Sequence, residues 1–364
     1  MNKRFNNIDI LKSLAIYLVI IYHFNRIDIN IIQPKNDLIY INLFLKSFFS
    51  VCVPIFFFVN GFLLLNKDKI DLKKHINKII KIIILSLFWG VVTLVSLMFI
   101  RGEFLSLQET IKSIWFLKVW WNAHLWFLFD LIVIYIFYPL IHTCFKSDKK
   151  VFYFFFVCVM LFTFGNVLLG NIATVISYVT NRFSNIDFQV NYFSSINPFR
   201  GIPGYSIGYF ILGGIIGKEF SPFLDRNKRK FTIIAIFALP IFTFCLSLYT
   251  IIVSLRSKQM WDVVWNGYSN IFTLLNVISL YIISISFKSN NYFGKFIRIV
   301  SDNSLGIYFI HVIVGDFLML YYDNLEYSNI FFINIIFAFI ILLISLLLTV
   351  ILSKTPVVKY FTYI

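Results

Sequence analysis

The sequence predicts an all-α polytopic membrane protein with about ten transmembrane helices and with both termini in the cytoplasm. Of the 364 residues, 59% are apolar and only 13% are charged. Several apolar runs reach the roughly 17–25 residues that a helix needs to cross a bilayer. Segments that are rich in Lys and Arg alternate along the chain with segments that are poor in them, as expected of loops on opposite sides of a membrane.

Ten apolar segments are expected to form the spanning helices. In chain order they are residues 8–24, 44–65, 79–100, 124–141, 151–172, 203–220, 231–253, 268–286, 303–321 and 330–352. The polar segments between them are too short to hold a soluble domain. We therefore expect a single integral membrane domain over residues 1–364.

The basic residues between these segments predict the orientation. With the N-terminal MNKR placed in the cytoplasm, the cytoplasmic segments carry roughly twice as many Lys and Arg residues as the outer segments. This bias explains most of the net charge of +15. Since the basic residues form no compact domain, no nucleic-acid partner is expected.

The first span, IDILKSLAIYLVIIYHF, carries Lys12 near one end and His23 near the other. Eleven helical steps of about 100° place both side chains on one face, about 16 Å apart along the axis. Ionisable groups inside a membrane span are costly, so each is a functional candidate. The alternatives are a snorkelling lysine and a hydrogen-bonded interfacial histidine.

The fourth span opens with His124 and Trp126 at its outer boundary, and Asp130 lies roughly two turns deeper. A carboxylate at that depth needs a partner or a polar cavity. Asp130 is therefore expected either to orient a histidine or to pair with a basic residue for structure. Trp126 also fits an interfacial aromatic belt.

The ninth span places His311 near the middle of the membrane and Asp316 nearer the outer side. His23, His124 and His311 all fall in the middle or outer part of the membrane in the predicted orientation. The structural alternative for His311 is a buried histidine with a hydrogen-bond partner.

Lys78 and Lys81 begin the third span, three residues apart and therefore on neighbouring positions of a helix. They fit either ordinary positive flanking or an anion site for phosphates at the cytoplasmic face. The cysteines show no spacing typical of a disulfide framework or a metal site, and no metal is expected.

The sixth span is rich in glycine, and two interpretations are open. Small residues let helix backbones approach closely, or they leave a gap for a substrate tail. The five glycines are Gly204, Gly208, Gly213, Gly214 and Gly217.

Several of these segments together resemble the acyltransferase-3 family of membrane acyltransferases. NIDILKSLAIYLVIIYHF resembles the opening motif of an arginine, ten residues and a histidine, with Lys12 at the arginine position and His23 at the histidine. VPIFFFVNGFLLL resembles the second motif, with Asn-Gly where Ser-Gly is usual. KIIKIIILSLFW resembles the Arg-x-x-Arg start of the third span, with Lys78 and Lys81 at the two arginines.

Two further stretches complete the resemblance, which covers nearly the whole chain. They are HLWFLFDLIVIYIFYPLI and SDNSLGIYFIHVIV, and they supply His124, Trp126, Asp130 and His311. No single motif is specific, but five occur in the family's order.

The resemblance implies transfer of a short acyl group, commonly acetyl, from cytoplasmic acyl-CoA to a sugar hydroxyl of a cell-surface polysaccharide or lipid-linked glycan. It implies a multi-pass protein of the bacterial cytoplasmic (inner) membrane, whose partners are membrane lipids, the acyl-CoA donor and the glycan acceptor. No permanently bound cofactor is expected.

The residue roles follow from the same resemblance. Lys12, Lys78 and Lys81 are expected to hold the anionic donor. His23 is expected to act as general base, oriented by Asp130 or His311. The acceptor is expected to meet three further residues: His124, Trp126 and Arg200. Arg200 either neutralises a thioester oxyanion or binds an acidic sugar.

Two other functions remain open from the residues alone. A transporter or flippase for a polysaccharide or lipid-linked sugar is expected to show internal repeats and broken helix pairs, and no clear repeat is present. A glycan polymerase is expected to use large basic outer loops, which only residues 173–202 resemble.

Overall fold

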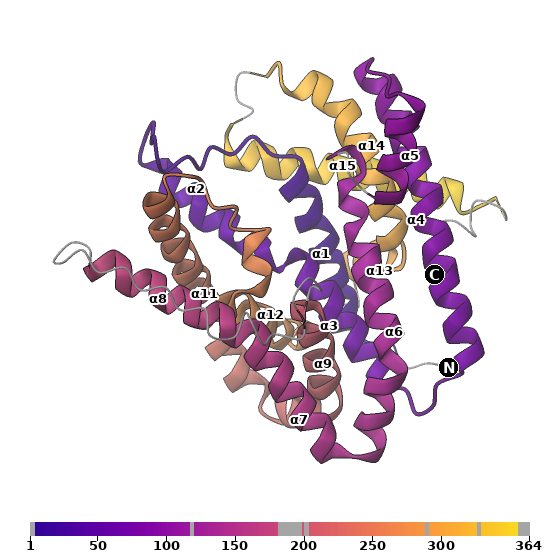
Figure 1. Ribbon diagram of the computed structural model, residues 1–364, viewed down its shortest axis with the longest axis vertical. Helices are drawn as coiled ribbons and strands as arrows, with labels where there is room; N and C mark the ends of the chain where they lie inside the picture. The colour runs from indigo at the N-terminus through magenta and orange to yellow at the C-terminus, as the bar shows by residue number, and fades with distance from the viewer. Residues whose placement is uncertain are drawn as a thin grey trace. The chain divides into compact units, whose positions relative to one another are not determined.

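The computed structural model describes residues 4–116, 120–180, 199, 204–287, 291–325 and 329–355, and the regular secondary structure among these residues is entirely helical (Figure 1). Each of the ten predicted spans overlaps one or more helices of the described residues. The all-α fold class is confirmed.

Among the described residues, seven helices are long and apolar enough to cross a membrane. They are Leu38–Leu65, Leu72–Arg101, Asn122–Ser147, Lys149–Thr180, Lys228–Ser257, Ser304–Tyr322 and Phe331–Leu352. The other three predicted spans are the shorter α9 (Gly204–Ile215) and α12 (Ile271–Ile285), and α1 (Asn6–His23), whose first two turns carry polar and charged residues. The structure thus supports a multi-pass membrane protein, while the count of ten and the orientation of the termini stay predictions.

Contacts divide the chain into two compact units. Unit 1 comprises Met1–Leu11, Asp28–Asn66 and Ile141–Ser289. Unit 2 comprises Lys12–Ile27, Lys67–Leu140 and Asn290–Ile364. Helices α1 and α6 (Trp126–Ser147) contribute to both, and the single domain predicted for residues 1–364 stays a prediction.

Unit 1 holds the helices that lie between α1 and α4 in the chain and those from α7 to α12. These are α2 (Leu38–Ser47), α3 (Cys52–Leu65), α7 (Lys149–Met160), α8 (Asn166–Thr180), α9, α10 (Ser221–Arg226), α11 (Lys228–Ser257) and α12. A π-helical turn, η3 (Leu161–Gly165), joins α7 to α8, and another, η4 (Ile216–Phe220), follows α9.

The closest packing in unit 1 joins α3 to α9 through glycines on both helices. A Cβ added to Gly213 would lie 2.0 Å from the carbonyl oxygen of Phe58, and one added to Gly61 would lie 1.7 Å from that of Phe210. Only glycine permits such an approach of two backbones. The close-packing interpretation of the glycine-rich sixth span is therefore confirmed.

Unit 2 contains the remaining helices. They are the C-terminal part of α1 from Lys12, α4 (Leu72–Arg101), α5 (Leu107–Phe116), most of α6, α13 (Tyr292–Asp302), α14 (Ser304–Tyr322) and α15 (Phe331–Leu352). The Asp71 carboxylate caps the start of α4 by accepting from the backbone N–H of Lys74.

Helix α14 packs against both α4 and α15. The rings of Trp89 and Phe309 stack between α4 and α14, with centroids 5.1 Å apart. On its α15 side, α14 presents Gly306, where an added Cβ would meet Thr349 at 2.2 Å. These contacts fix α14, which carries His311 and Asp316, against its neighbours.

Candidate functional site

His23 is the last residue of α1, and its imidazole is exposed. Two side-chain hydrogen bonds fix this part of α1 within unit 2. The hydroxyl of Ser13 donates to the carbonyl of Ile297 at 2.9 Å, and that of Tyr17 donates to the carbonyl of Ile335 at 2.8 Å. Lys12 is half-buried on the same helix.

His311 is completely buried in the middle of α14. Its Nδ1 lies 2.6 Å from the carbonyl oxygen of Tyr308. A carbonyl oxygen only accepts, so Nδ1 carries the proton and Nε2 of the neutral ring has a free lone pair. Nε2 is buried and has no hydrogen-bond partner.

The three histidines predicted to share one part of the membrane form a cluster. The ring centroid of His311 lies 5.5 Å from that of His23 and 5.7 Å from that of His124. His124 is buried, its Nε2 also lacks a partner, and its backbone carbonyl accepts a hydrogen bond from the Tyr308 hydroxyl. The exposed imidazole of His23 thus belongs to one cluster with the buried imidazoles of His124 and His311.

His23 also lines a cavity of about 490 Å³, a size typical of small-molecule sites. Apolar side chains, including Phe24 and Leu320, form part of its wall. The polar lining residues are His23, Arg26, Arg101, Asp316 and Asp323.

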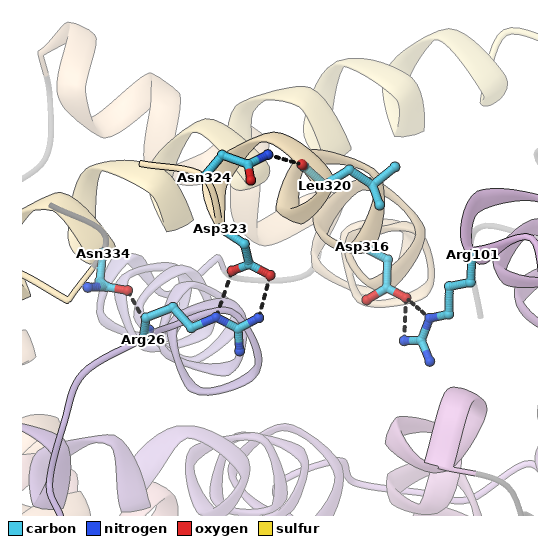
Figure 2. Close-up of polar contacts among 7 residues, drawn as sticks. All are labelled: Arg26, Arg101, Asp316, Leu320, Asp323, Asn324 and Asn334. Atoms are coloured by element: carbon cyan, nitrogen blue, oxygen red, sulfur yellow. Dashed lines mark hydrogen bonds and ion pairs between the residues drawn. The ribbon is translucent and has the colours of Figure 1, made fainter. Parts of the chain in front are cut away.

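The first ion pair at this cavity joins Arg26 to Asp323 (Figure 2). Nε and Nη2 of Arg26 donate to Oδ1 and Oδ2 of Asp323, each at 2.7 Å, so both carboxylate oxygens are engaged. The backbone N–H of Arg26 also donates to Oδ1 of Asn334 at 2.7 Å. The hydrogen bond from Arg26 lowers the pKa of Asp323 from its usual 3.8.

The second ion pair joins Arg101, the last residue of α4, to Asp316 on α14. Nε and Nη2 of Arg101 donate to the same oxygen, Oδ2, at 2.8 and 2.5 Å. Figure 2 shows the Asp316 carboxylate turned toward Arg101 and that of Asp323 toward Arg26.

No role was predicted from the sequence for the two arginines and Asp323, and Asp316 was noted there without a function. Arg26 and Arg101 were indistinguishable there from basic residues that flank a span. Only the folded structure reveals these pairs, because 215 positions in the sequence separate Arg101 from Asp316 and 297 separate Arg26 from Asp323.

Asp130 and Trp126 are both half-buried near the start of α6. Oδ2 of Asp130 is buried without a hydrogen-bond partner. Within the described part of the chain, Asp130 neither accepts from one of the clustered histidines nor pairs with a basic residue. Among the described residues, neither predicted contact of Asp130 is therefore formed.

Lys78 and Lys81 lie in the second and third turns of α4 rather than at its start, because the helix begins at Leu72. The ammonium of Lys78 lies 5.1 Å from the centroid of the Tyr135 ring. Burial and the positive charge of Lys78 lower the pKa of Lys67, a lysine that the sequence analysis missed. Three lysines thus gather where phosphate groups would be attracted.

These lysines and the cavity occupy opposite ends of α4. Twenty-three residues separate Lys78 from Arg101, which corresponds to roughly 34 Å along a helix. This distance is comparable with the thickness of the hydrocarbon core of a bilayer. Unit 2 therefore carries a cationic region at one end and the His23 cavity at the other.

Arg200 lies outside the described residues. Among the residues that the structure does describe, no group of three or more His, Cys, Asp or Glu side chains could hold a metal ion.

Comparison with known proteins identifies the class. The family model described as an acyltransferase domain, acyltransferase-3, matches residues 5–354. No curated protein matches the chain, and no solved structure matches it. The match spans nearly the whole chain and includes both units. The chain belongs to the acyltransferase-3 family and is a membrane acyltransferase of the kind that acts on sugars.

Proposed function

We propose that this protein transfers a short acyl group, which we expect to be acetyl, from acyl-CoA to a sugar hydroxyl at the cytoplasmic membrane of a bacterium. The acceptor is a cell-surface polysaccharide or its lipid-linked precursor. One observation carries the proposal: His23 is exposed on the wall of a cavity, with two buried imidazoles behind it.

His23 acts as the general base in this reaction. Its imidazole takes the proton of the acceptor hydroxyl while the hydroxyl oxygen forms a bond to the thioester carbonyl carbon. The carbon–sulfur bond then breaks, and the departing thiolate receives a proton, which restores the neutral imidazole. An imidazole with a pKa near neutrality suits both transfers.

His311 acts as a positioning residue for His23. The Tyr308 carbonyl holds its Nδ1 proton, so its free Nε2 is available to accept from a His23 imidazolium. We propose that His124 and Trp126 border the acceptor site. Arg200 is proposed to act on the acceptor or on the oxyanion.

Lys12, Lys78 and Lys81, joined by Lys67, hold the phosphates of the donor. Lysine offers point charges rather than the planar fork of arginine, and it attracts phosphate without the bidentate geometry. The acyl group then reaches from this cationic end of unit 2 toward His23. The separation of roughly 34 Å between Lys78 and Arg101 along α4 supports a reaction that brings together groups from opposite membrane faces.

Mass spectrometry of the surface glycan from strains with and without the gene tests this proposal. The expected result is a mass difference of one acyl unit per modified residue, which also identifies the acyl group. A glycan with unchanged acylation but altered export or chain length would instead indicate a transporter or a polymerase.

A further inference from the structure

The cavity beside His23 contains two ion pairs of the same chemistry but of different geometry. In the Arg26–Asp323 pair, each carboxylate oxygen accepts one hydrogen bond. In the Arg101–Asp316 pair, Oδ2 accepts both hydrogen bonds. Oδ1 of Asp316 therefore accepts no hydrogen bond from any described residue.

The two carboxylate side chains also differ in how much of their surface is exposed to solvent. The Asp323 side chain is 46% exposed and the Asp316 side chain is 16% exposed. Arg26 additionally binds Asn334, so the first pair joins the segment after α1 to α14 and α15. The first pair has the geometry of a structural clamp, whereas the second presents a carboxylate oxygen without a hydrogen bond to the cavity.

A partly buried carboxylate oxygen that lines a cavity is matched best by a hydrogen-bond donor. Asp316 and His23 line the same cavity, so a hydroxyl-bearing molecule held by Asp316 presents its other hydroxyls near the imidazole. Phe24 and Leu320 add apolar surface suited to the C–H face of a sugar ring.

The charges of the cavity indicate which sugars fit. Each guanidinium is already neutralised by a carboxylate. An anionic sugar would have to displace Asp316 or Asp323 and would lie beside a second negative charge, which is unfavourable.

We propose that this cavity binds an uncharged, hydroxyl-rich sugar residue of the acceptor, and that Asp316, oriented by Arg101, accepts a hydrogen bond from one of its hydroxyls. The inference rests on the proposed acyl transfer and adds the substrate class and a specificity-determining residue. Replacing Asp316 with asparagine removes the negative charge of the acceptor and the carboxylate that neutralises Arg101, so it shifts the preference toward anionic sugars.

Acyl transfer by the purified protein in nanodiscs tests the proposal. The donor is acetyl-CoA, and the acceptors are membranes of the deletion strain, methyl glucoside and methyl glucuronide. For the membranes, Asp316→Asn is expected to raise the acceptor KM by roughly 10- to 100-fold, as for a hydrogen bond to a charged group. It should leave the KM for acetyl-CoA unchanged and raise the rate with methyl glucuronide relative to methyl glucoside.

Glu219→Gln is the matched control, because it removes the Lys149–Glu219 ion pair of 2.9 Å, whose residues do not line the cavity. It is expected to change the acceptor KM by less than about twofold. Should Asp316→Asn fail to accumulate, Arg101→Lys keeps the charge but not the paired donors, and is expected to raise the acceptor KM roughly 3- to 10-fold.

The outcomes separate this inference from the proposed function. A wild-type protein that transfers acetyl groups while the Asp316 and Arg101 variants keep the wild-type acceptor KM overturns the inference alone. Acetylation found by mass spectrometry on an acidic sugar residue also overturns it. Absence of any acyl transfer by the wild-type protein overturns both.

Discussion

The substitution Gly61→Ala tests the packing that holds unit 1 together. The added methyl carbon would lie 1.7 Å from the Phe210 carbonyl oxygen, whereas ordinary contact begins near 3.4 Å. Helices α3 and α9 must therefore separate by roughly 1.7 Å, because the clash involves backbone atoms that no side-chain rotation relieves. Such overpacking costs about 3 kcal/mol, at the upper end of the usual range.

A matched control is available on α8 of the same unit. An added Cβ at Gly170 meets no atom within 4 Å. Gly170→Ala is therefore expected to stabilise the protein by up to about 1 kcal/mol through helix propensity. Since Gly61→Ala gains the same propensity, its net cost is about 2 kcal/mol, and the two variants should differ by about 3 kcal/mol.

Unfolding of the purified protein by increasing SDS in mixed micelles, followed by far-UV circular dichroism, measures these free energies. Gly213→Ala, which places a Cβ 2.0 Å from the Phe58 carbonyl oxygen, should behave like Gly61→Ala. Equal stability of Gly61→Ala and Gly170→Ala, within about 0.5 kcal/mol, would refute the close approach of α3 and α9.

The remaining predictions concern the site. His311→Asn removes the free Nε2, so kcat should fall roughly 100-fold with altered pH dependence, and an unchanged pH–rate profile would exclude the positioning role. Lys78→Ala should raise the KM for acetyl-CoA about 10-fold while Lys78→Arg retains affinity, and equal KM values would remove Lys78 from the donor site. Because hydrogen bonding from Arg26 lowers the pKa of Asp323 below 3.8, the clamp stabilises the fold above that pH and is lost as pH falls through the lowered value. Melting curves of wild type and Asp323→Asn should therefore differ by a constant amount between about pH 5 and 8 and converge only as the pH falls through the lowered pKa of Asp323; a difference that already disappears by pH 5 would contradict this.

The sequence was sufficient to locate the helices because apolar runs and helical periodicity are local properties. The face shared by Lys12 and His23 follows from spacing alone. The gathering of His23, His124 and His311 was anticipated only as a common depth in the membrane. Their ring distances of 5.5 and 5.7 Å depend on how α1, α6 and α14 pack, which periodicity does not specify.

Two features lay beyond sequence reasoning for physical reasons. Asp130 was expected to have a partner because buried carboxylates usually do, yet its Oδ2 has none. The pairing of Arg101 with Asp316 depends on α4 lying beside α14, and an arginine at the end of a span has the same local pattern whether it flanks the membrane or lines a site.

The number of membrane-spanning helices is a third feature that could not be predicted fully from the sequence. Helix α12 has 15 residues and α9 has 12 before its π-helical turn, both below the usual length for crossing a bilayer. Flanking residues such as Tyr268 made the corresponding segments look longer in the sequence than their helices are.

The central claim is that His23 performs acyl transfer, and transfer of isotope-labelled acetyl from acetyl-CoA to deletion-strain membranes tests it most directly. Wild-type protein is expected to label the glycan, whereas His23→Ala, present in the membrane at the wild-type level, is expected to label none. His75→Gln is the control histidine variant, because His75 lies away from the cavity and glutamine retains a donor for the Tyr135 carbonyl, 2.7 Å from Nε2. Full labelling by His23→Ala would contradict the claim.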